Sequence, residues 1–402
     1  MPIPPILDVF VVWHPDDPEG VKRFREVQDH FHSAAFSGLV GGAVEVYGRS
    51  EAWLPNGAPR PFGITTALAD GLPAAQFNAI VPVLSKEMAR AAATSGWKEF
   101  IADIQALTAV PDVGIFSVPA DGVDLEKGAL AAALGPFQLL PRDVVHNPKL
   151  LGRELDQAIA QKIRGDDGQS KRITVFVSHS KHRSLTEDDE APAIYESVRE
   201  RIAKSHLAEF FDARDIQVGD RWVDELENNA SEHALLIVRT DRYAERPWTQ
   251  REVKAAKQSE VPVVTMYAIR SGEQQGSFLM DHVPTVACDL ADRTPGIEAA
   301  LDALVTEALK STLWNAQRSY LESDGFDWLP ARSPEPTTIA PWLAAHKSEH
   351  PDDQRIWIMH PDPPLGQAER DLLVQMVELA GYSDDVNIYT PRTFASKGGE
   401  VK

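Results

Sequence analysis

The segment Trp248-Thr249-Gln250-Arg251-Glu252 decides the fold, together with the apolar run that precedes it. That run, residues 234–238, consists of Ala, Leu, Leu, Ile and Val, a composition typical of a strand buried on both faces. Pro247 stands directly before Trp248 and is a favourable first residue of a helix. The sequence therefore predicts a buried strand followed by a helix that carries Trp248 and Glu252.

Apolar strands and amphipathic helices alternate on both sides of this segment. Upstream, Val175-Phe176-Val177 leads into Ser178-His179-Ser180, and a helical stretch with an apolar residue at every fourth position follows. A second strand ends before the polar loop 212–221, and residues 261–267 form a further apolar run after Glu252. Apolar strands that alternate with helices are typical of a parallel sheet covered on both faces.

The same order of elements begins three times along the chain. A first copy starts with the apolar strand at residues 8–13, and a third starts at residues 355–359. The predicted fold class is α/β, with tandem flavodoxin-like domains, each a parallel sheet flanked by helices. We expect a first domain at 1–165, a second at 171–310, a helix end and proline-rich connector at 311–354, and at 355–402 the start of a third domain, apparently incomplete.

Two stretches rich in turn-forming residues separate the copies. Residues 165–170 hold two glycines and small polar residues, which predicts a hinge. A long helical pattern at 297–321 is followed by prolines at positions 330, 334, 336 and 341. Because proline interrupts helices, these prolines predict an extended connector.

Composition narrows the classes of partner. The chain has 402 residues, 43% of them hydrophobic, which suits two or three globular domains. Its 40 basic and 60 acidic residues give a net charge of -20, which disfavours nucleic acid and anionic membranes as partners. Cys288 is the only cysteine, so an internal disulfide and a cysteine zinc site are excluded, as suits a reducing compartment. We expect a cytoplasmic protein without a membrane span or a metal.

The quoted motifs, in this order and at this spacing, resemble the TIR (Toll/interleukin-1 receptor) domain over residues 171–290. Residues 1–165 and 355–402 resemble it more weakly. TIR domains include adaptors that only assemble and enzymes that break the bond between nicotinamide and ribose in NAD+. The resemblance to the bacterial immune enzymes implies that Glu252 is the catalytic residue, that NAD+ is the substrate and that no cofactor is needed.

The chemistry of NAD+ explains how one carboxylate could suffice. Nicotinamide leaves from a cationic ring, so its departure needs no general acid. The ribosyl cation that remains resembles the oxocarbenium centre that a carboxylate stabilises in glycosidases. In the alternative interpretation, Glu252 is an exposed helix residue paired with a basic neighbour. Residues 255 and 256, where such a partner would stand, are both alanine, which favours the catalytic interpretation.

Other residues are predicted to contact the substrate. Strand ends at the carboxyl edge of a parallel sheet bind ligands, and the resemblance places a mobile ligand-covering loop after the second strand. The predicted substrate-binding residues are Ser178, His179, Ser180, Lys181, Asp212, Ile216, Gly219 and Trp248. Enzymatic relatives often have arginines where this chain has Ser180 and Lys181. For His179 a hydrogen-bonded structural role is favoured over a chemical one, and for Trp248 packing in the core is favoured.

The first copy lacks the matching acid. Its helix after the third strand carries Trp97, and position 101, four residues later, is Ile101. We therefore expect residues 1–165 to form a TIR-like module that cannot perform the same chemistry.

These observations lead to two functional hypotheses and a weaker third. The first is an NAD+ nucleosidase that gives nicotinamide and ADP-ribose or a cyclic product, active on self-assembly through TIR–TIR contacts, in antiphage or innate immune defence. The second is a scaffold or adaptor that assembles through its TIR-like modules without catalysis. The third is a toxin-like factor that depletes the NAD+ of another cell.

Overall fold

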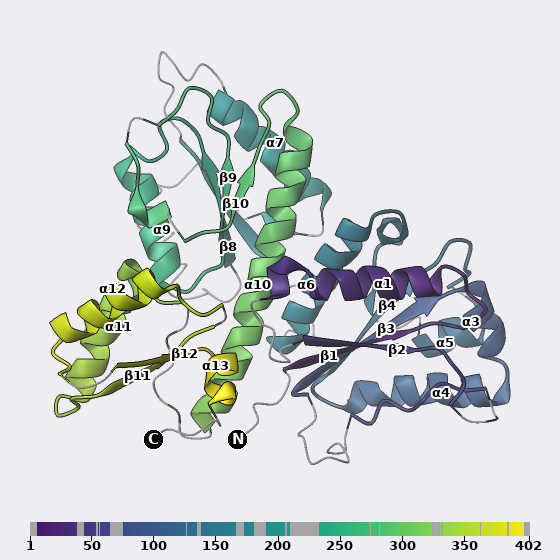
Figure 1. The fold of residues 1–402 in the computed structure, drawn as a ribbon. Helices are drawn as coiled ribbons and strands as arrows, with labels where there is room; N and C mark the ends of the chain where they lie inside the picture. The colour runs from purple at the N-terminus through teal and green to yellow at the C-terminus, as the bar shows by residue number, and fades with distance from the viewer. Residues whose placement is uncertain are drawn as a thin grey trace.

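The computed structural model describes residues 6–37, 44–53, 55, 57–64, 75–125, 127–134, 138–165, 173–180, 190–205, 207–209, 233–273, 275–280, 282–323, 326, 330, 333–361, 363–383 and 386–397. Three parallel sheets lie within these ranges, and we name the units around them the first, second and third modules (Figure 1).

The first module is a five-stranded parallel sheet in the order β2-β1-β3-β4-β5. Apolar packing divides its helices between the two faces of the sheet: α1 and α6 cover one, and α3, α4 and α5 cover the other. Its elements are β1 (Leu7–Val12), α1 (Gly20–Phe31), α2 (Ala34–Ser37), β2 (Val44–Arg49), β3 (Phe77–Leu84), α3 (Lys86–Ala91), α4 (Ser95–Ala106), β4 (Val113–Pro119), α5 (Ala129–Leu134), β5 (Gln138–Leu139) and α6 (Pro148–Ile163).

The second module repeats this order, with strands β7-β6-β8-β9-β10 from one edge to the other, all parallel. Helices α7 and α10 pack on one face, and α9 packs on the other. Its elements are β6 (Thr174–Ser178), α7 (Glu190–Lys204), β7 (Ala208–Glu209), β8 (His233–Arg239), α9 (Pro247–Gln258), β9 (Val263–Tyr267), β10 (Thr285–Ala287) and α10 (Arg293–Ser323). A strand order of 2-1-3-4-5 is flavodoxin-like, so the predicted fold class is confirmed.

The third module has two parallel strands between helices. Its elements are α11 (Pro336–Glu349), β11 (Ile356–Met359), α12 (Gln367–Leu379), β12 (Val386–Tyr389) and α13 (Pro391–Ser396). The extended connector predicted from the prolines is wrong where α11 forms. Pro336 lies in the first turn, where a missing N–H costs little, and Ile339 and Leu343 are buried in the module's core. This packing outweighs the interruption that Pro341 causes inside the helix.

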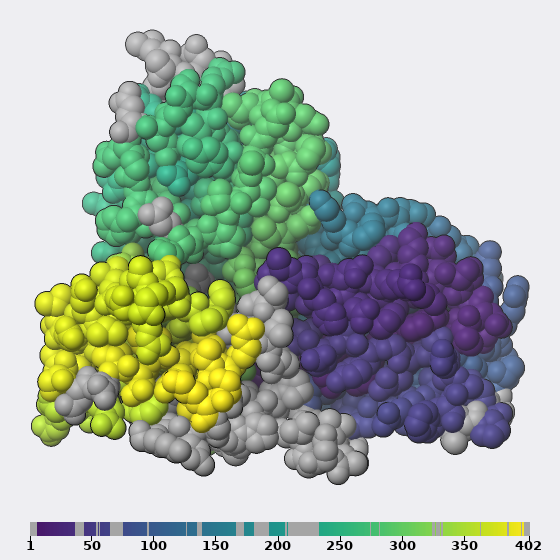
Figure 2. All heavy atoms as spheres, in the orientation of Figure 1, coloured from purple at the N-terminus to yellow at the C-terminus, as the bar shows by residue number. Residues whose placement is uncertain are grey.

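Helix α10 joins the three modules. Its first half packs in the core of the second module, whereas Leu309 and Leu313 pack in the core of the first. Trp314 and Leu321 then cluster with Met359 and Phe394 of the third. In Figure 1, α10 runs beside α6 toward α13, and Figure 2 shows the second module, in green, against both the first and the third. The predicted boundary at residue 310 therefore falls inside a continuous helix.

Buried polar contacts reinforce the junction of α6 with α10. The fully buried Asp156 accepts a hydrogen bond from the hydroxyl of Thr306 at 2.8 Å and lies 2.8 Å from Nε2 of His30. Arg153 contacts Glu298 at 2.9 Å and Asp302 at 3.2 Å. These contacts connect α1 and α6 of the first module to α10.

The pKa of His30 makes this junction sensitive to pH. Burial disfavours the charged ring, but the negative charge of Asp156 and its hydrogen bond outweigh burial, so the pKa of His30 lies above its ordinary 6.5. Protonated His30 therefore stabilises the fold fully below pH 6.5, and this contribution is lost as the pH rises through the higher folded value.

Thermal unfolding tests this assignment. We expect wild type to have a higher melting temperature than His30→Asn at low pH, and this advantage in melting temperature should shrink as the pH rises through that window. His32→Asn, which changes an exposed histidine after the same helix, should show no such trend. An advantage that is constant from pH 5 to pH 8 would contradict the assignment.

Candidate functional site

The helix that carries Glu252 is anchored before it begins. Pro247 occupies its first turn, and the hydroxyl of Thr249 bonds to the carbonyl oxygens of Tyr243 at 2.7 Å and Arg246 at 2.8 Å. The side-chain amide of Gln250 donates to the carbonyl oxygen of Ala244 at 2.7 Å. The loop between β8 and α9 is therefore tied to the first turn of the helix.

Glu252 lies on the buried face of α9. The buried positions 249, 252, 253, 256 and 257 follow the spacing of one helix face, and Val253 and Ala256 on that face pack in an apolar core. Glu252 itself is only 2% exposed. The alternative interpretation, an exposed helix residue, is therefore wrong. A carboxylate in such surroundings requires polar partners, because transfer of a charge from water to an apolar interior is costly.

Ser178 and Tyr243 provide such partners. The hydroxyl of Ser178, the last residue of β6, donates to Oε2 of Glu252 at 2.6 Å. The phenol oxygen of Tyr243 lies 2.6 Å from the same Ser178 Oγ. Ser178 is 1% exposed and Tyr243 is fully buried. The three side chains come from the end of β6, the loop after β8 and helix α9, and they form one buried hydrogen-bonded chain.

Burial and charge also act on the tyrosine. Removal from water and the negative charge of Glu252 raise the pKa of Tyr243 well above 10, although the Ser178 hydrogen bond and the positive charge of Arg239 oppose the shift. The phenol is therefore neutral at physiological pH and keeps its proton for hydrogen bonding.

The loops at the carboxyl edge of the second sheet are fixed by charged side chains. Arg239, at the end of β8, forms two parallel hydrogen bonds with Glu273, of 2.8 and 2.6 Å. Asp241 accepts hydrogen bonds from the backbone N–H groups of three successive residues, 270 to 272, at 2.9 to 3.2 Å. These contacts join the loop after β8 to the loop after β9, beside the strand end where Ser178 lies.

The remaining predicted residues occupy different surroundings. His179 is buried, and its ring stacks on Tyr195 of α7 with centroids 3.9 Å apart. Ser180 is buried, and Trp248 is half-buried in the first turn of α9. The predicted residues Lys181, Asp212, Ile216 and Gly219 lie outside the described residues. The structure thus brings Ser178 to Glu252, and substrate contact by Ser178 and by the others stays a prediction.

Sequence reasoning missed Tyr243. Its signal was a tyrosine in the loop between a fully apolar strand and Trp248, five residues before the tryptophan. The first module shows what the same place contains without an acid. On α4, Trp97 and Ile101 are both buried in an apolar cluster.

Residues 175–305 match a family model described as TIR domain. The second module is a TIR domain. The match extends beyond residue 290, where the resemblance in the sequence ends, into α10 and within the predicted domain 171–310, and it does not cover the first or third modules, whose TIR resemblance stays a prediction. No curated protein matches the chain.

Among solved structures, the chain is similar to tagatose-6-phosphate ketose/aldose isomerase from Escherichia coli, with 12% identity, 77% of this chain and 83% of that chain covered, and a TM-score of 0.19. A TM-score this low carries no argument about fold or function.

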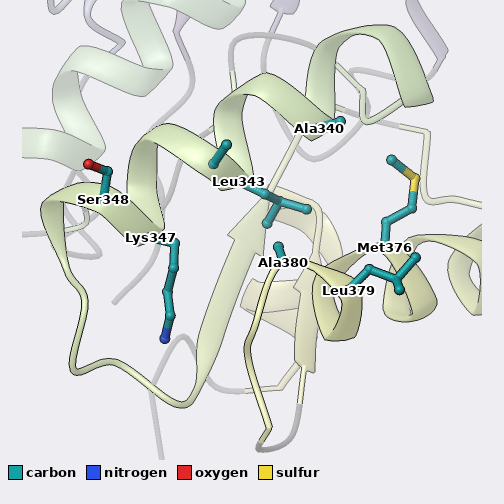
Figure 3. Close-up of a pocket in the computed structure, with 8 residues that line it drawn as sticks. Ala340, Leu343, Lys347, Ser348, Met376, Leu379 and Ala380 are labelled. Carbon is teal, nitrogen blue, oxygen red and sulfur yellow. The ribbon is translucent and has the colours of Figure 1, made fainter.

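The described residues contain no cluster of three His, Cys, Asp or Glu side chains that could hold a metal ion. Nor does any helix within them have the length and apolar content to cross a membrane. A cavity of about 510 Å³ lies between α11 and α12 of the third module (Figure 3), lined mostly by Ala, Leu and Met with Lys347 at its side. None of its lining residues belongs to the TIR domain.

The hydrogen-bonded chain predicts a difference between two buried serines. Ser178→Ala should lower the free energy of unfolding by about 1–3 kcal/mol, because it leaves Tyr243 and Glu252 without the hydroxyl that joins them. Ser180 is equally buried, but within the described ranges its hydroxyl makes no hydrogen bond, so Ser180→Ala removes an unsatisfied polar group and should not lower the free energy of unfolding. Chemical denaturation of the two variants measures the difference. Equal losses would show that the Ser178 contacts do not stabilise the fold.

Proposed function

We propose that the TIR domain cleaves the nicotinamide–ribose bond of NAD+, with Glu252 stabilising the ribosyl cation. The observation that supports this most is the buried Glu252 carboxylate, held by Ser178 at the carboxyl end of β6. A single fixed carboxylate suits the chemistry, because nicotinamide leaves without a proton and only the cation needs an opposing charge. NAD+ is the substrate in this proposal, and no cofactor takes part.

In the reaction, the C1′–N bond of the nicotinamide riboside breaks and its electron pair leaves with neutral nicotinamide. The ribosyl cation then takes either water, to give ADP-ribose and a proton, or a nitrogen of the adenine in the same molecule, to give a cyclic product. Glu252 performs the same electrostatic role in both outcomes. The proposal therefore includes hydrolysis and cyclisation, and the product distribution separates them.

Burial of Glu252 bears on activation. A carboxylate that is 2% exposed cannot touch a dinucleotide until groups around it move. We therefore include self-assembly through TIR–TIR contacts as the event that opens the site, in a cytoplasmic defence protein. On this basis the isolated chain is inactive and the assembled chain is active.

An assembling scaffold without catalysis is the second candidate function. The first module favours it, because its corresponding helix buries Ile101 in an apolar cluster and offers no acid. One flavodoxin-like module of this chain thus holds its fold without a charged site. Under this hypothesis the TIR domain assembles in the same way and Glu252 serves stability alone.

Nicotinamide release distinguishes the two functions. Wild type, Glu252→Gln and Glu252→Ala should be compared with Glu260→Gln, which changes a partly exposed acid just after the same helix. We expect both Glu252 variants to lose about 100-fold or more in kcat, because the opposing charge is gone, and Glu260→Gln to stay within about twofold. Chromatography of nicotinamide, ADP-ribose and cyclic products identifies the outcome. Release that is undetectable from assembled wild type would favour the scaffold.

Assembly makes a separate prediction. If the site opens only on TIR–TIR contact, the rate per chain should rise with protein concentration, and light scattering should show assemblies over the same range. The rate per chain should rise in wild type only. The light scattering should rise in both wild type and Glu252→Gln, because assembly does not require the carboxylate. A rate per chain that stays constant over a 100-fold dilution would contradict activation by assembly.

A further inference from the structure

We propose that Tyr243 is a positioning residue of the TIR-domain site, which orients the Glu252 carboxylate by donating a hydrogen bond to Ser178. The proposal rests on the proposed function only in its catalytic consequence. The structural part, a hydrogen-bonded chain with one direction, concerns the folded protein without substrate.

The direction follows from the number of protons. Ser178 has one hydroxyl hydrogen and is within 2.6 Å of both Glu252 Oε2 and the Tyr243 phenol oxygen. A carboxylate only accepts, so Ser178 must give its hydrogen to Glu252. The contact with Tyr243 can then be a hydrogen bond only if the phenol donates to Ser178 Oγ. The hydrogen bonds are therefore donated from Tyr243 to Ser178 and from Ser178 to Glu252 when the glutamate is ionised. Their direction would be reversed if Glu252 were protonated.

The surroundings keep the phenol able to donate. Tyr243 is fully buried, and the negative charge of Glu252 opposes a second negative charge beside it. The tyrosine therefore keeps its proton over the whole physiological range. The phenol can therefore donate in the direction that stabilises a charged carboxylate, which is the state needed to oppose a ribosyl cation.

The tyrosine is also fixed relative to the helix that carries the acid. Its backbone carbonyl accepts hydrogen bonds from the Thr249 hydroxyl at 2.7 Å and from the backbone N–H of Arg246 at 3.2 Å. These bonds hold the tyrosine loop on the first turn of α9. Ser178, in contrast, belongs to β6, whose neighbours in the sheet fix it independently. The side-chain bonds of Tyr243 and Glu252 to Ser178 therefore lock the helix onto the strand end, and the carboxylate with it.

This position differs from a merely structural role in two measurable ways. A group that orients the acid through Ser178 affects the chemical step more than substrate binding. Its loss also adds little once Ser178 is removed, because among the described hydrogen bonds the Tyr243 hydroxyl reaches Glu252 through Ser178.

The kinetic test is a double-mutant cycle. We expect Tyr243→Phe to lower kcat for nicotinamide release about 10- to 100-fold with KM within about twofold, because a small misplacement of a reacting group is costly. Ser178→Ala should lower kcat at least as much, and Ser178→Ala/Tyr243→Phe should be no slower than Ser178→Ala. The control is Tyr267→Phe, which changes an exposed tyrosine at the end of β9 and should keep wild-type kinetics. Unchanged kcat in Tyr243→Phe, or independent losses that multiply in the double variant, would overturn the positioning role.

The spectroscopic test needs no activity. The tyrosine doublet in the Raman spectrum reports whether a phenol donates or accepts, and the difference between wild type and Tyr243→Phe isolates Tyr243. We expect a donor signature in wild type and its loss when the same difference is taken in the Ser178→Ala background. An acceptor signature, or one that Ser178→Ala leaves unchanged, would overturn the proposed direction.

The two tests separate the two proposals. Wild type that cleaves NAD+ while Tyr243→Phe keeps its kcat supports the proposed function and overturns the positioning role. Wild type that releases no nicotinamide overturns the proposed function and the catalytic consequence drawn here. In that case the Raman spectra still decide whether Tyr243 holds Glu252 through Ser178.

Discussion

The structure depends on the apolar packing of helix α10 against all three modules. Its 31 residues extend over about 46 Å at 1.5 Å per residue, long enough to leave one module and enter two others. Its buried residues lie on several sides of the helix, with Leu301 in the second core, Leu313 in the first and Leu321 beside the third. A helix that is apolar on several sides must be covered on several sides. The three modules therefore complete one another through this element.

The position of the candidate site follows from this arrangement. Because α7 and α10 cover one face of the TIR-domain sheet, α9 is left to cover the other and brings Glu252 to the end of β6. The far end of α9 is also held, since the buried Lys257 bonds to Glu335 at 2.8 Å, just before α11 of the third module. The helix that carries the acid is thus fixed at its start by its own loop and at its end by another module. Displacement of the third module would consequently break or strain the Lys257–Glu335 contact and shift the end of α9.

The parts that could be predicted from the sequence are those with a local signal. The apolar strand at 234–238 and the proline before Trp248 predicted β8 and α9, because alternation and capping depend on neighbouring residues. The contact of Ser178 with Tyr243 spans 65 positions and that of Lys257 with Glu335 spans 78, and no local pattern records such pairs. The helix at 336–349 was missed for a related reason. Local rules count Pro341 against a helix, whereas burial of Ile339 and Leu343 in the third core decides in its favour.

The two flavodoxin-like modules of this chain show what Glu252 costs. On α4 of the first module, Ile101 follows Trp97 by four residues and packs among apolar side chains, which stabilises that module by burial alone. On α9 of the TIR domain, Glu252 follows Trp248 by four residues on an equally buried face. Burial of a carboxylate there costs several kcal/mol unless hydrogen bonds offset the loss of water. Ser178 makes such a hydrogen bond to Glu252, and Tyr243 in turn bonds to Ser178. A fold that needs only stability has a less costly solution in the same chain, and this contrast supports the catalytic role that we propose for Glu252.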